Sequence, residues 1–216
     1  HARENGAKES LGQLADDVGR TIADRWLSNK LWIKLGGRPI VLVFGPQAFG
    51  EAEFVQFRQG VGKVNLLTLH EQKPFADGVF DWPLPSQGTL FTNAFMRRTP
   101  SARLRIATAY PRFRDYYEEG GQAGFPEIKD KSGATYRETL RTALKSNADA
   151  VQVATWNDWQ EGTQIEPSIE FGCRDLIETQ NLRREVDPRF RYKPEDINST
   201  LQNFLNKRRA KLPTRR

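Results

Sequence analysis

The chain has 216 residues, about the length of a single domain. It contains 33 lysines and arginines against 27 aspartates and glutamates, for a formal net charge of +6, and 38% of its residues are hydrophobic. This hydrophobic content excludes a wholly disordered chain. A single cysteine, Cys173, excludes an intrachain disulfide framework and a cysteine-rich zinc site, and two histidines, His1 and His70, do not supply a polyhistidine metal centre. No apolar run approaches the roughly 18 residues of a membrane-spanning helix.

The positive charge is concentrated at the C-terminal end. Residues 181–216 contain 11 basic and 4 acidic residues, whereas residues 1–180 contain 22 basic and 23 acidic ones. The basic run at residues 207–211, followed by Arg215 and Arg216, is compatible with nucleic-acid binding or with a nuclear localisation signal. We favour a helix end that runs into a solvated tail, because no aromatic residues interleave with the cluster as single-strand binding requires.

The first elements along the chain are a helix and a hairpin. An apolar face spaced by three and four residues predicts an amphipathic helix over residues 10–27, with Leu11, Leu14, Val18, Ile22 and Trp26 on that face. Residues 31–45 predict a hairpin that turns at Gly36 and Gly37. Its second arm is apolar at every position over residues 40–44, which predicts a strand buried on both faces, as in a parallel sheet covered by helices.

The rest of the chain alternates between helical and strand patterns. Helices are predicted at residues 51–59 and 136–146, and strands at 64–70, 78–85, 104–111 and 150–158; from residue 171 onward the chain is mostly helical and polar. Strands that alternate with helices predict right-handed βαβ units and a parallel sheet of about five strands. Polar and aromatic residues follow these strands, at the edge where both (β/α) barrels and doubly wound sheets place their sites.

The most informative stretch is residues 155–167, TWNDWQEGTQIEP, which leaves the last predicted strand. It places Asp158 and Glu161 three residues apart, framed by Trp156 and Trp159. If the stretch makes one helical turn, both carboxylates face the same way, with Cβ atoms roughly 5–6 Å apart. Glycosidic cleavage needs one protonated and one ionised carboxyl group, and aromatic faces stack on sugar rings. Spacing alone leaves a second interpretation open, because Asp-x-x-Glu at a helix start is also an ordinary capping arrangement.

The amino-acid sequence of this stretch resembles the signature of a known family. WNDWQEGTQIEP closely resembles the W-N-E-W-x-E-G-T-x-I-E-P signature of glycoside hydrolase family 99, and it is similar to the W-N-D-Y-G-E-S element of family 71, the α-1,3-glucanases. Looser similarities link residues 32–45, 78–85, 107–115 and 170–184 to the fourth, sixth and seventh barrel strands and the closing helix of that group. The resemblance implies an α/β fold, a (β/α)8 TIM-type barrel, and only the eighth-strand motif is highly specific.

The resemblance also implies roles for the two carboxylates. In family 99 the counterpart of Glu161 is the general acid/base on the leaving oxygen. The counterpart of Asp158 is a base that deprotonates the sugar's own 2-hydroxyl, which gives a retained product through an anhydro-sugar intermediate. Asp158 stands where family 99 has Glu and matches family 71, whereas Trp159 matches family 99 rather than the Tyr of family 71.

Seven further residues are candidates for substrate binding. They lie in the motif or at the ends of other predicted strands: Trp156, Asn157, Trp159, Glu166, Trp82, Tyr110 and His70. For Trp82 a core position is the alternative, and His70 fits equally well as a rim histidine without a ligand.

The strand count covers only part of a barrel, which has eight strands in about 250 residues. We expect residues 1–180 to be the C-terminal part of a barrel catalytic domain, about its last five strands, and residues 181–216 to be its closing helix and basic tail. Because the chain opens with His1, we expect an upstream segment or another polypeptide to supply the N-terminal half.

Together these observations predict a glycoside hydrolase that cleaves an α-linked glycan, an α-mannoside or an α-glucan, with Asp158 and Glu161 and without a metal or other cofactor. A carbohydrate-binding relative without turnover is the competing class, and a nucleic-acid-binding protein that uses the basic tail is a third. The partner expected is an oligosaccharide or polysaccharide, and the resemblance implies a secreted or periplasmic location.

Overall fold

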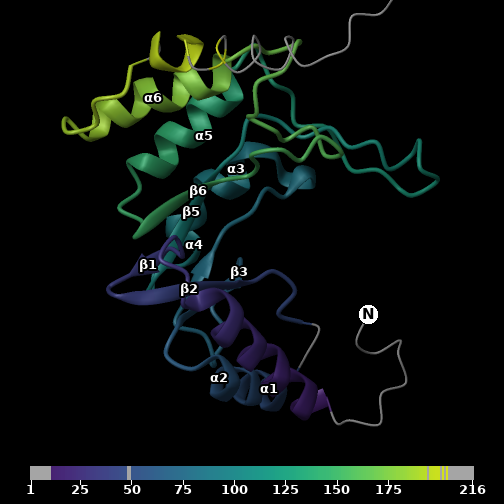
Figure 1. Cartoon of the computed structure of the whole chain (residues 1–216). Coiled ribbons are helices and arrows are strands. Elements are labelled where there is room, and N and C mark those ends of the chain that lie inside the picture. The colour runs from purple at the N-terminus through teal and green to yellow at the C-terminus, as the bar shows by residue number, and fades with distance from the viewer. Residues whose placement is uncertain (1–10, 48–49, 194, 200, 202, 204–216) are drawn as a thin grey trace, which may run out of the picture. The chain divides into compact units, whose positions relative to one another are not determined.

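The computed structural model describes residues 11–47, 50–193, 195–199, 201 and 203 (Figure 1). The chain divides into two compact units: unit 1 comprises residues 1–81 and 95–106, and unit 2 comprises residues 82–94 and 107–216. The basic residues 207–211 and 215–216 lie outside the described part of the chain. None of the described helices has the length and apolar character of a transmembrane segment.

The strands of the sheet follow one another in chain order. They are β1 (Lys34–Leu35), β2 (Arg38–Val43), β3 (Asn65–Leu69), β4 (Gly78–Phe80), β5 (Arg105–Ala109) and β6 (Ala150–Val153). β1 and β2 form the predicted antiparallel hairpin, and the pairs β2–β3, β3–β4 and β4–β5 are parallel. The α/β class and the mostly parallel sheet are therefore confirmed, and each of the five strands expected for the sheet forms.

The prediction that β2 is buried on both faces is wrong. Val41 is buried and packs in a cluster with Val61, Val64 and Leu66, but the side chain of Leu42 is 39% exposed. Alternate residues of a strand point to opposite faces. The all-apolar run therefore covers the core with one face only and leaves the other face of β2 exposed.

In unit 1, helix α1 (Leu11–Ile22) packs along α2 (Glu51–Val61), as Figure 1 shows. A π-helical turn, Ala23–Leu27, continues α1. The two helices approach most closely at two glycines: a Cβ atom on Gly60 would lie 2.2 Å from the carbonyl oxygen of Asp16, and one on Gly19 would lie 2.4 Å from that of Phe57. Only glycine fits at such a crossing.

The close crossing also changes which face of α1 is buried. Spacing predicted a buried stripe through Val18 and Trp26, yet these side chains are 46% and 51% exposed. The buried residues of α1 are instead Ala15, Asp16 and Gly19. Small residues let the backbones approach at the crossing, and of the apolar stripe Ile22 packs, partly buried, against the cluster around Val41.

In unit 2, helix α5 (Ala134–Leu144) lies beside α6 (Arg174–Val186), and the hydroxyls of Tyr136 and Thr179 are hydrogen-bonded at 2.8 Å (Figure 1). Both helices confirm predicted ones. The sequence patterns did not predict the 3₁₀ turn Pro85–Gln87 and α3 (Gly88–Asn93) of unit 2, or α4 (Phe95–Arg98) of unit 1.

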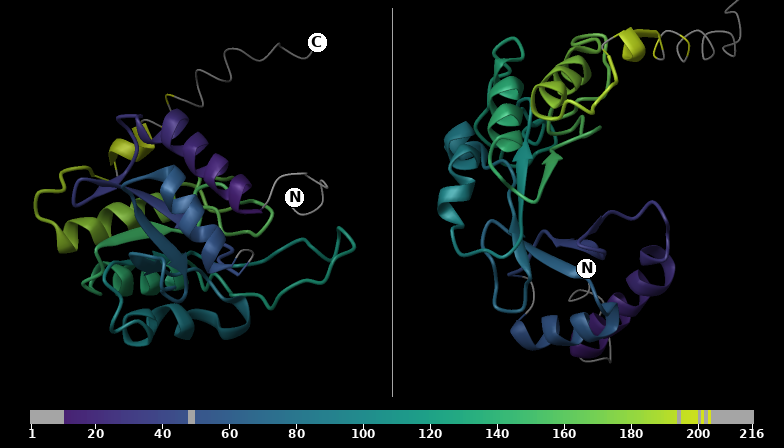
Figure 2. Two further views of the ribbon diagram at one scale, coloured as in Figure 1. Left: turned by 90° about the horizontal axis from the view of Figure 1, so that it is seen from below. Right: turned by 90° about the vertical axis from the view of Figure 1, so that its left-hand side faces the viewer.

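A long loop, residues 110–133, connects β5 to α5 without a helix or an extended strand. Its two arms run side by side in Figure 2 and are joined by a bridge between Phe113 and Ile128, whose backbone groups exchange two hydrogen bonds of 2.9 Å. Phe113 and Ile128 also belong to the core of unit 2, together with Tyr110 and Ala154. The loop is therefore anchored at its base.

Candidate active site

The motif forms a closed loop directly after β6. The N–H of Thr155 donates to the carbonyl of Thr163 at 3.0 Å, and the hydroxyls of these two threonines lie 2.9 Å apart. The N–H of Ile165 donates back to the carbonyl of Thr155 at 3.0 Å. These bonds hold residues 156–162 as a compact turn at the end of a strand, with a fixed base.

Asp158 closes this turn. Its own N–H donates to the hydroxyl of Thr155 at 3.0 Å, and its Oδ1 accepts the N–H of Glu161, also at 3.0 Å. The segment is a hydrogen-bonded turn rather than a helix. Oδ1 of Asp158 therefore makes a capping hydrogen bond, as the second interpretation of the Asp-x-x-Glu spacing expected. The other oxygen of this partly buried carboxylate, Oδ2, is not used in that bond.

Glu161 is held by the long loop. The phenol of Tyr117 donates to Oε1 of Glu161 at 2.6 Å, across 44 residues of sequence. This hydrogen bond is the largest cause that raises the pKa of Tyr117 to about 12, since losing the phenol proton beside a carboxylate is unfavourable. Residue spacing could not find Tyr117, and its only sequence signal is its place shortly after a predicted strand.

Main-chain bonds dock the same loop on the motif. The N–H of Arg114 donates to the carbonyl of Glu161 at 2.9 Å, and the N–H of Tyr116 donates to that of Gln160 at 3.2 Å. Gly162 follows with a φ of +63°, and a Cβ atom there would lie 2.8 Å from the carbonyl oxygen of Arg114. The glycine of the motif thus allows both the turn and the close approach of the loop.

Two tryptophans flank the carboxylates. The side chains of Trp156 and Trp159 are 51% and 47% exposed, and Asn157 between them is exposed as well. The indole N–H of Trp159 donates to Oε2 of Glu166 at 3.0 Å. Glu166 therefore orients an indole ring whose face remains available at the surface.

The remaining predicted residues lie elsewhere. Tyr110 is fully buried in the unit 2 core, so its hydroxyl does not line an open surface, and Trp82 is half-buried against the same cluster. His70 belongs to unit 1. Its main-chain N–H donates to the carbonyl of Phe80 at 2.8 Å, and Nε2 of its imidazole lies 3.9 Å from Oδ1 of the buried Asp81. The structure thus brings six of the predicted residues together on the motif loop, Trp156, Asn157, Asp158, Trp159, Glu161 and Glu166, with Trp82 and Tyr110 in the same unit.

Behind the motif, sequence reasoning missed a buried ionic cluster. Arg112 is 6% exposed; it donates to Oδ2 of Asp175 at 3.0 Å and to Oδ1 of Asp130 at 3.1 Å. It also donates to the carbonyl of Gln164 at 2.7 Å, and thereby ties the cluster to the motif loop. Burial lowers the pKa of Arg112, although both carboxylates oppose that shift.

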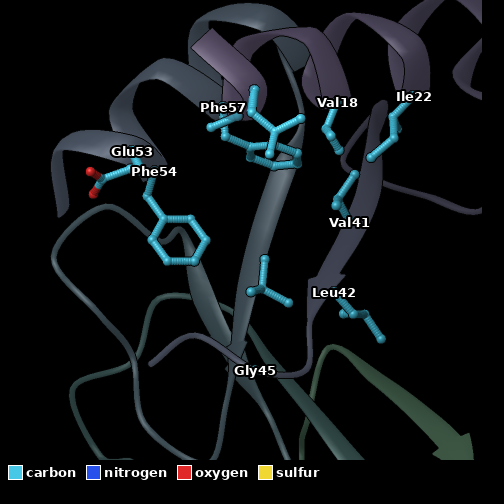
Figure 3. A pocket seen from close by; sticks show the side chains of 11 residues that line it. Val18, Ile22, Val41, Leu42, Gly45, Glu53, Phe54 and Phe57 are labelled. Carbon is cyan, nitrogen blue, oxygen red and sulfur yellow. The ribbon is translucent and has the colours of Figure 1, made fainter. Parts of the chain in front are cut away.

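The structure has a pocket beside the motif loop and another in unit 1. One, of about 690 Å³, lies beside Trp159 and is lined also by Pro167 and Ile169. The other, of about 370 Å³, lies in unit 1 among α1, β2 and α2, where apolar side chains such as Val41 surround it and the carboxylate of Glu53 lies to one side (Figure 3). Among the described residues, no group of three or more His, Cys, Asp and Glu side chains is arranged to hold a metal ion.

No family model matches the sequence, and no curated protein matches it either. Solved structures do match. The family 99 (GH99) endo-α-mannosidase from Bacteroides thetaiotaomicron, in complex with bis-tris-propane, aligns with a TM-score of 0.63 at 14% identity over 83% of this chain and 68% of that one. A second structure of that endo-α-mannosidase aligns at 0.61 and 14% identity, over 84% of this chain and 65% of the other.

A glycoside hydrolase-like protein aligns with a TM-score of 0.58 at 17% identity, over 87% of this chain and 64% of its own. This chain therefore spans about two-thirds of the length of the structures that it matches. At such low identity the likeness concerns the fold. The chain has the α/β fold of part of a (β/α) barrel, and that fold resembles the one in the family 99 endo-α-mannosidase structures.

Proposed function

We propose that this chain is the C-terminal part of the catalytic barrel of a glycoside hydrolase that cleaves an α-linked glycan, an α-mannoside or an α-glucan. One observation supports this most strongly. Asp158 and Glu161 lie on one turn after β6, both partly buried, and the same turn carries the half-exposed Trp156 and Trp159. Carboxylates next to aromatic surface are the groups that glycosidic cleavage requires.

In the proposed reaction, Glu161 gives a proton to the glycosidic oxygen while the bond from that oxygen to the anomeric carbon breaks. Asp158, as a carboxylate, takes the proton of the attacking hydroxyl, which is the sugar's own 2-hydroxyl in the manner of family 99. The 2-oxygen thereby forms a bond to the anomeric carbon. Water then attacks the anomeric carbon and this bond to the 2-oxygen breaks; Glu161 takes the proton of the water, and Asp158 returns its proton to the 2-oxygen. Each carboxyl group ends the cycle as it began.

The surroundings of the pair support carbohydrate as the substrate class. Trp156 and Trp159 offer exposed ring faces, and the bond to Glu166 fixes one of the two indoles. The hollow of about 690 Å³ beside Trp159 provides room next to the turn. Tyr110 is left out of the proposed binding surface because it is fully buried.

A second candidate is a carbohydrate-binding relative without turnover. It is favoured by one observation: Oδ1 of Asp158 is used to cap the N–H of Glu161, and Asp is one methylene shorter than the Glu of the family 99 motif. In this alternative the tryptophans bind sugar while Asp158 only shapes the turn.

Incubation of the full-length protein with α-mannan and with α-1,3-glucan separates the two candidates. Hydrolysis predicts new reducing ends, lost in Glu161→Gln and Asp158→Asn but retained in Glu127→Gln, which changes an exposed carboxylate of the long loop. Calorimetric binding of either glycan without reducing ends would favour the binding protein. Neither binding nor cleavage of either glycan would contradict both.

A further inference from the structure

Tyr117 has a place in the site that the proposed reaction does not yet use. Its hydroxyl donates to Oε1 of Glu161 at 2.6 Å, a short hydrogen bond. Glu161 is fixed through its main chain as well, since its N–H donates to Asp158 and its carbonyl accepts the N–H of Arg114. Side chain and backbone of this one residue are thus held from two segments.

Tyr117 is itself held firmly. Its carbonyl accepts the N–H of Gln122 at 2.9 Å, and its ring lies edge-on to Phe125, with centroids 6.1 Å apart. Asp115 ties the two ends of this turn together, because its Oδ2 accepts the N–H of Phe125 at 2.8 Å. The phenol therefore approaches Glu161 from a preformed turn.

The phenol hydroxyl is not what docks the loop. The backbone bonds from Arg114 and Tyr116 to the carbonyls of Glu161 and Gln160 do so, and the Phe113–Ile128 bridge anchors the base of the loop. Removing one hydroxyl leaves all of these in place. Its specific consequence concerns the two oxygens of Glu161: a donor on Oε1 occupies that oxygen, so a proton carried by Glu161 resides on Oε2.

We infer that Tyr117 is a positioning residue, whose hydroxyl engages Oε1 of Glu161 and thereby makes Oε2 the oxygen that exchanges the proton with the substrate. The inference rests on the proposed function, since it assigns the proton-carrying atom of that reaction. A fixed carboxyl geometry is required because small misplacements of a proton donor reduce the rate strongly.

The kinetic test compares Tyr117→Phe with Tyr116→Phe, which removes the hydroxyl of the neighbouring, half-exposed tyrosine. We expect Tyr117→Phe to lower kcat by about 10- to 100-fold with KM within about twofold, and Tyr116→Phe to retain the wild-type kcat. A kcat of Tyr117→Phe equal to that of the wild type, while Glu161→Gln is inactive, would overturn the inference and leave the proposed function intact.

A second measurement does not depend on turnover. The NMR signal of the Tyr117 ring reports whether the phenol is ionised at about pH 11, between the ordinary pKa of 10.0 and the raised value of about 12. We expect the phenol to ionise at a lower pH in Glu161→Gln than in the full wild-type chain, because the amide carries no charge, while burial, Asp158 and Asp115 act in both proteins. Equal ionisation of Tyr117 in the two proteins overturns the inference, whereas an inactive wild type in which Tyr117 ionises less than in Glu161→Gln contradicts only the proposed function.

Discussion

The guanidinium of Arg112 lies over the ring of Phe171, with its central carbon 3.7 Å from the ring centroid. Arg174 approaches the same ring at 4.8 Å and shares Asp130 and Asp175 with Arg112. Two cations, two carboxylates and one aromatic ring thus form a partly buried cluster beside the motif loop, with Arg112 and Asp175 as its buried members. Its charges are balanced within it, which is the condition for burying them.

Arg112→Met therefore leaves Asp175, which is 3% exposed, with one cation instead of two, and the carbonyl of Gln164 without its donor. Breaking a buried pair from one side costs about 3–5 kcal/mol, so we expect a loss of that order in the free energy of unfolding. Urea denaturation measures it. Arg114→Met, at an exposed position, is the control and should change stability by less than about 0.5 kcal/mol. Equal stability of the two variants would mean that the cluster contributes nothing.

A second prediction concerns the crossing of α1 and α2. In Gly60→Ala the new methyl group would meet the carbonyl oxygen of Asp16 at 2.2 Å, a backbone atom that cannot move aside. We expect destabilisation by about 1–3 kcal/mol or more, as for other overpacked sites. Gly45→Ala is the matched control, because nothing lies within 4 Å of a Cβ atom there. The melting temperatures of the two variants test this prediction. A Gly60→Ala protein as stable as Gly45→Ala would contradict the close approach of α1 and α2 at Gly60.

The two roles of Asp158 can be separated by two substitutions. Asp158→Asn keeps an oxygen that accepts the N–H of Glu161, so we expect an unchanged melting temperature but an activity lower by about 10²- to 10⁴-fold, because the amide cannot take a proton. Asp158→Ala loses the cap as well, at about 1 kcal/mol of stability. Full glycan hydrolysis by Asp158→Asn would restrict this residue to its capping role.

The hydrogen bond between Tyr117 and Glu161 also predicts a pH dependence of stability. The pKa of Tyr117 is raised from 10.0 to about 12, first by the hydrogen bond to Glu161, then by burial, and to a lesser degree by the charges of Asp158 and Asp115. A pKa that is higher in the folded than in the unfolded state stabilises the fold fully below the unfolded value, and the contribution is lost as the pH rises through the folded value.

The wild type should therefore lose more stability between about pH 10 and pH 12 than Tyr117→Phe does, as measured by urea unfolding. Tyr136, whose pKa burial also raises, ionises in both proteins and cancels in the comparison. Parallel pH profiles for the two proteins would argue against the raised pKa of Tyr117.

The exposed face of β2 predicts the behaviour of the isolated chain. Leu42 and Phe44 are 39% and 55% exposed, which makes this strand prone to association. We expect residues 1–216 expressed alone to be poorly soluble or inactive, and a segment of roughly 100 residues, scaled from a full barrel, to supply three more strand–helix units. Sedimentation and glycan assays test this; a monomeric, cooperatively melting and active 216-residue protein would contradict it.

Which features could be predicted from the sequence depended on how far apart in the chain the contacting residues lie. Elements whose signal lies within a few residues were predicted, such as the continuous apolar run that became β3 and the periodic face of α5. The motif loop was located as well, because its residues are adjacent in sequence.

Features set by distant contacts were missed or misread. Tyr117 and Glu161 are 44 residues apart, and Arg112 and Asp175 are 63 apart, so no local pattern connects either pair. The prediction that Tyr110 binds substrate failed for the same reason. A tyrosine at a strand end can face a site or the core, and only the packing around it decides between the two.

The docking of the long loop on the motif uses main-chain atoms, from the N–H groups of Arg114 and Tyr116 to the carbonyls of Gln160 and Glu161. Such bonds are indifferent to the side chains that the four residues carry, apart from proline at a donor position. The outward side chains at positions 114, 116 and 160 can therefore change while the backbone of Glu161 stays in place. Substitutions at these three positions, other than proline at the two donors, should therefore preserve the turn that carries Glu161.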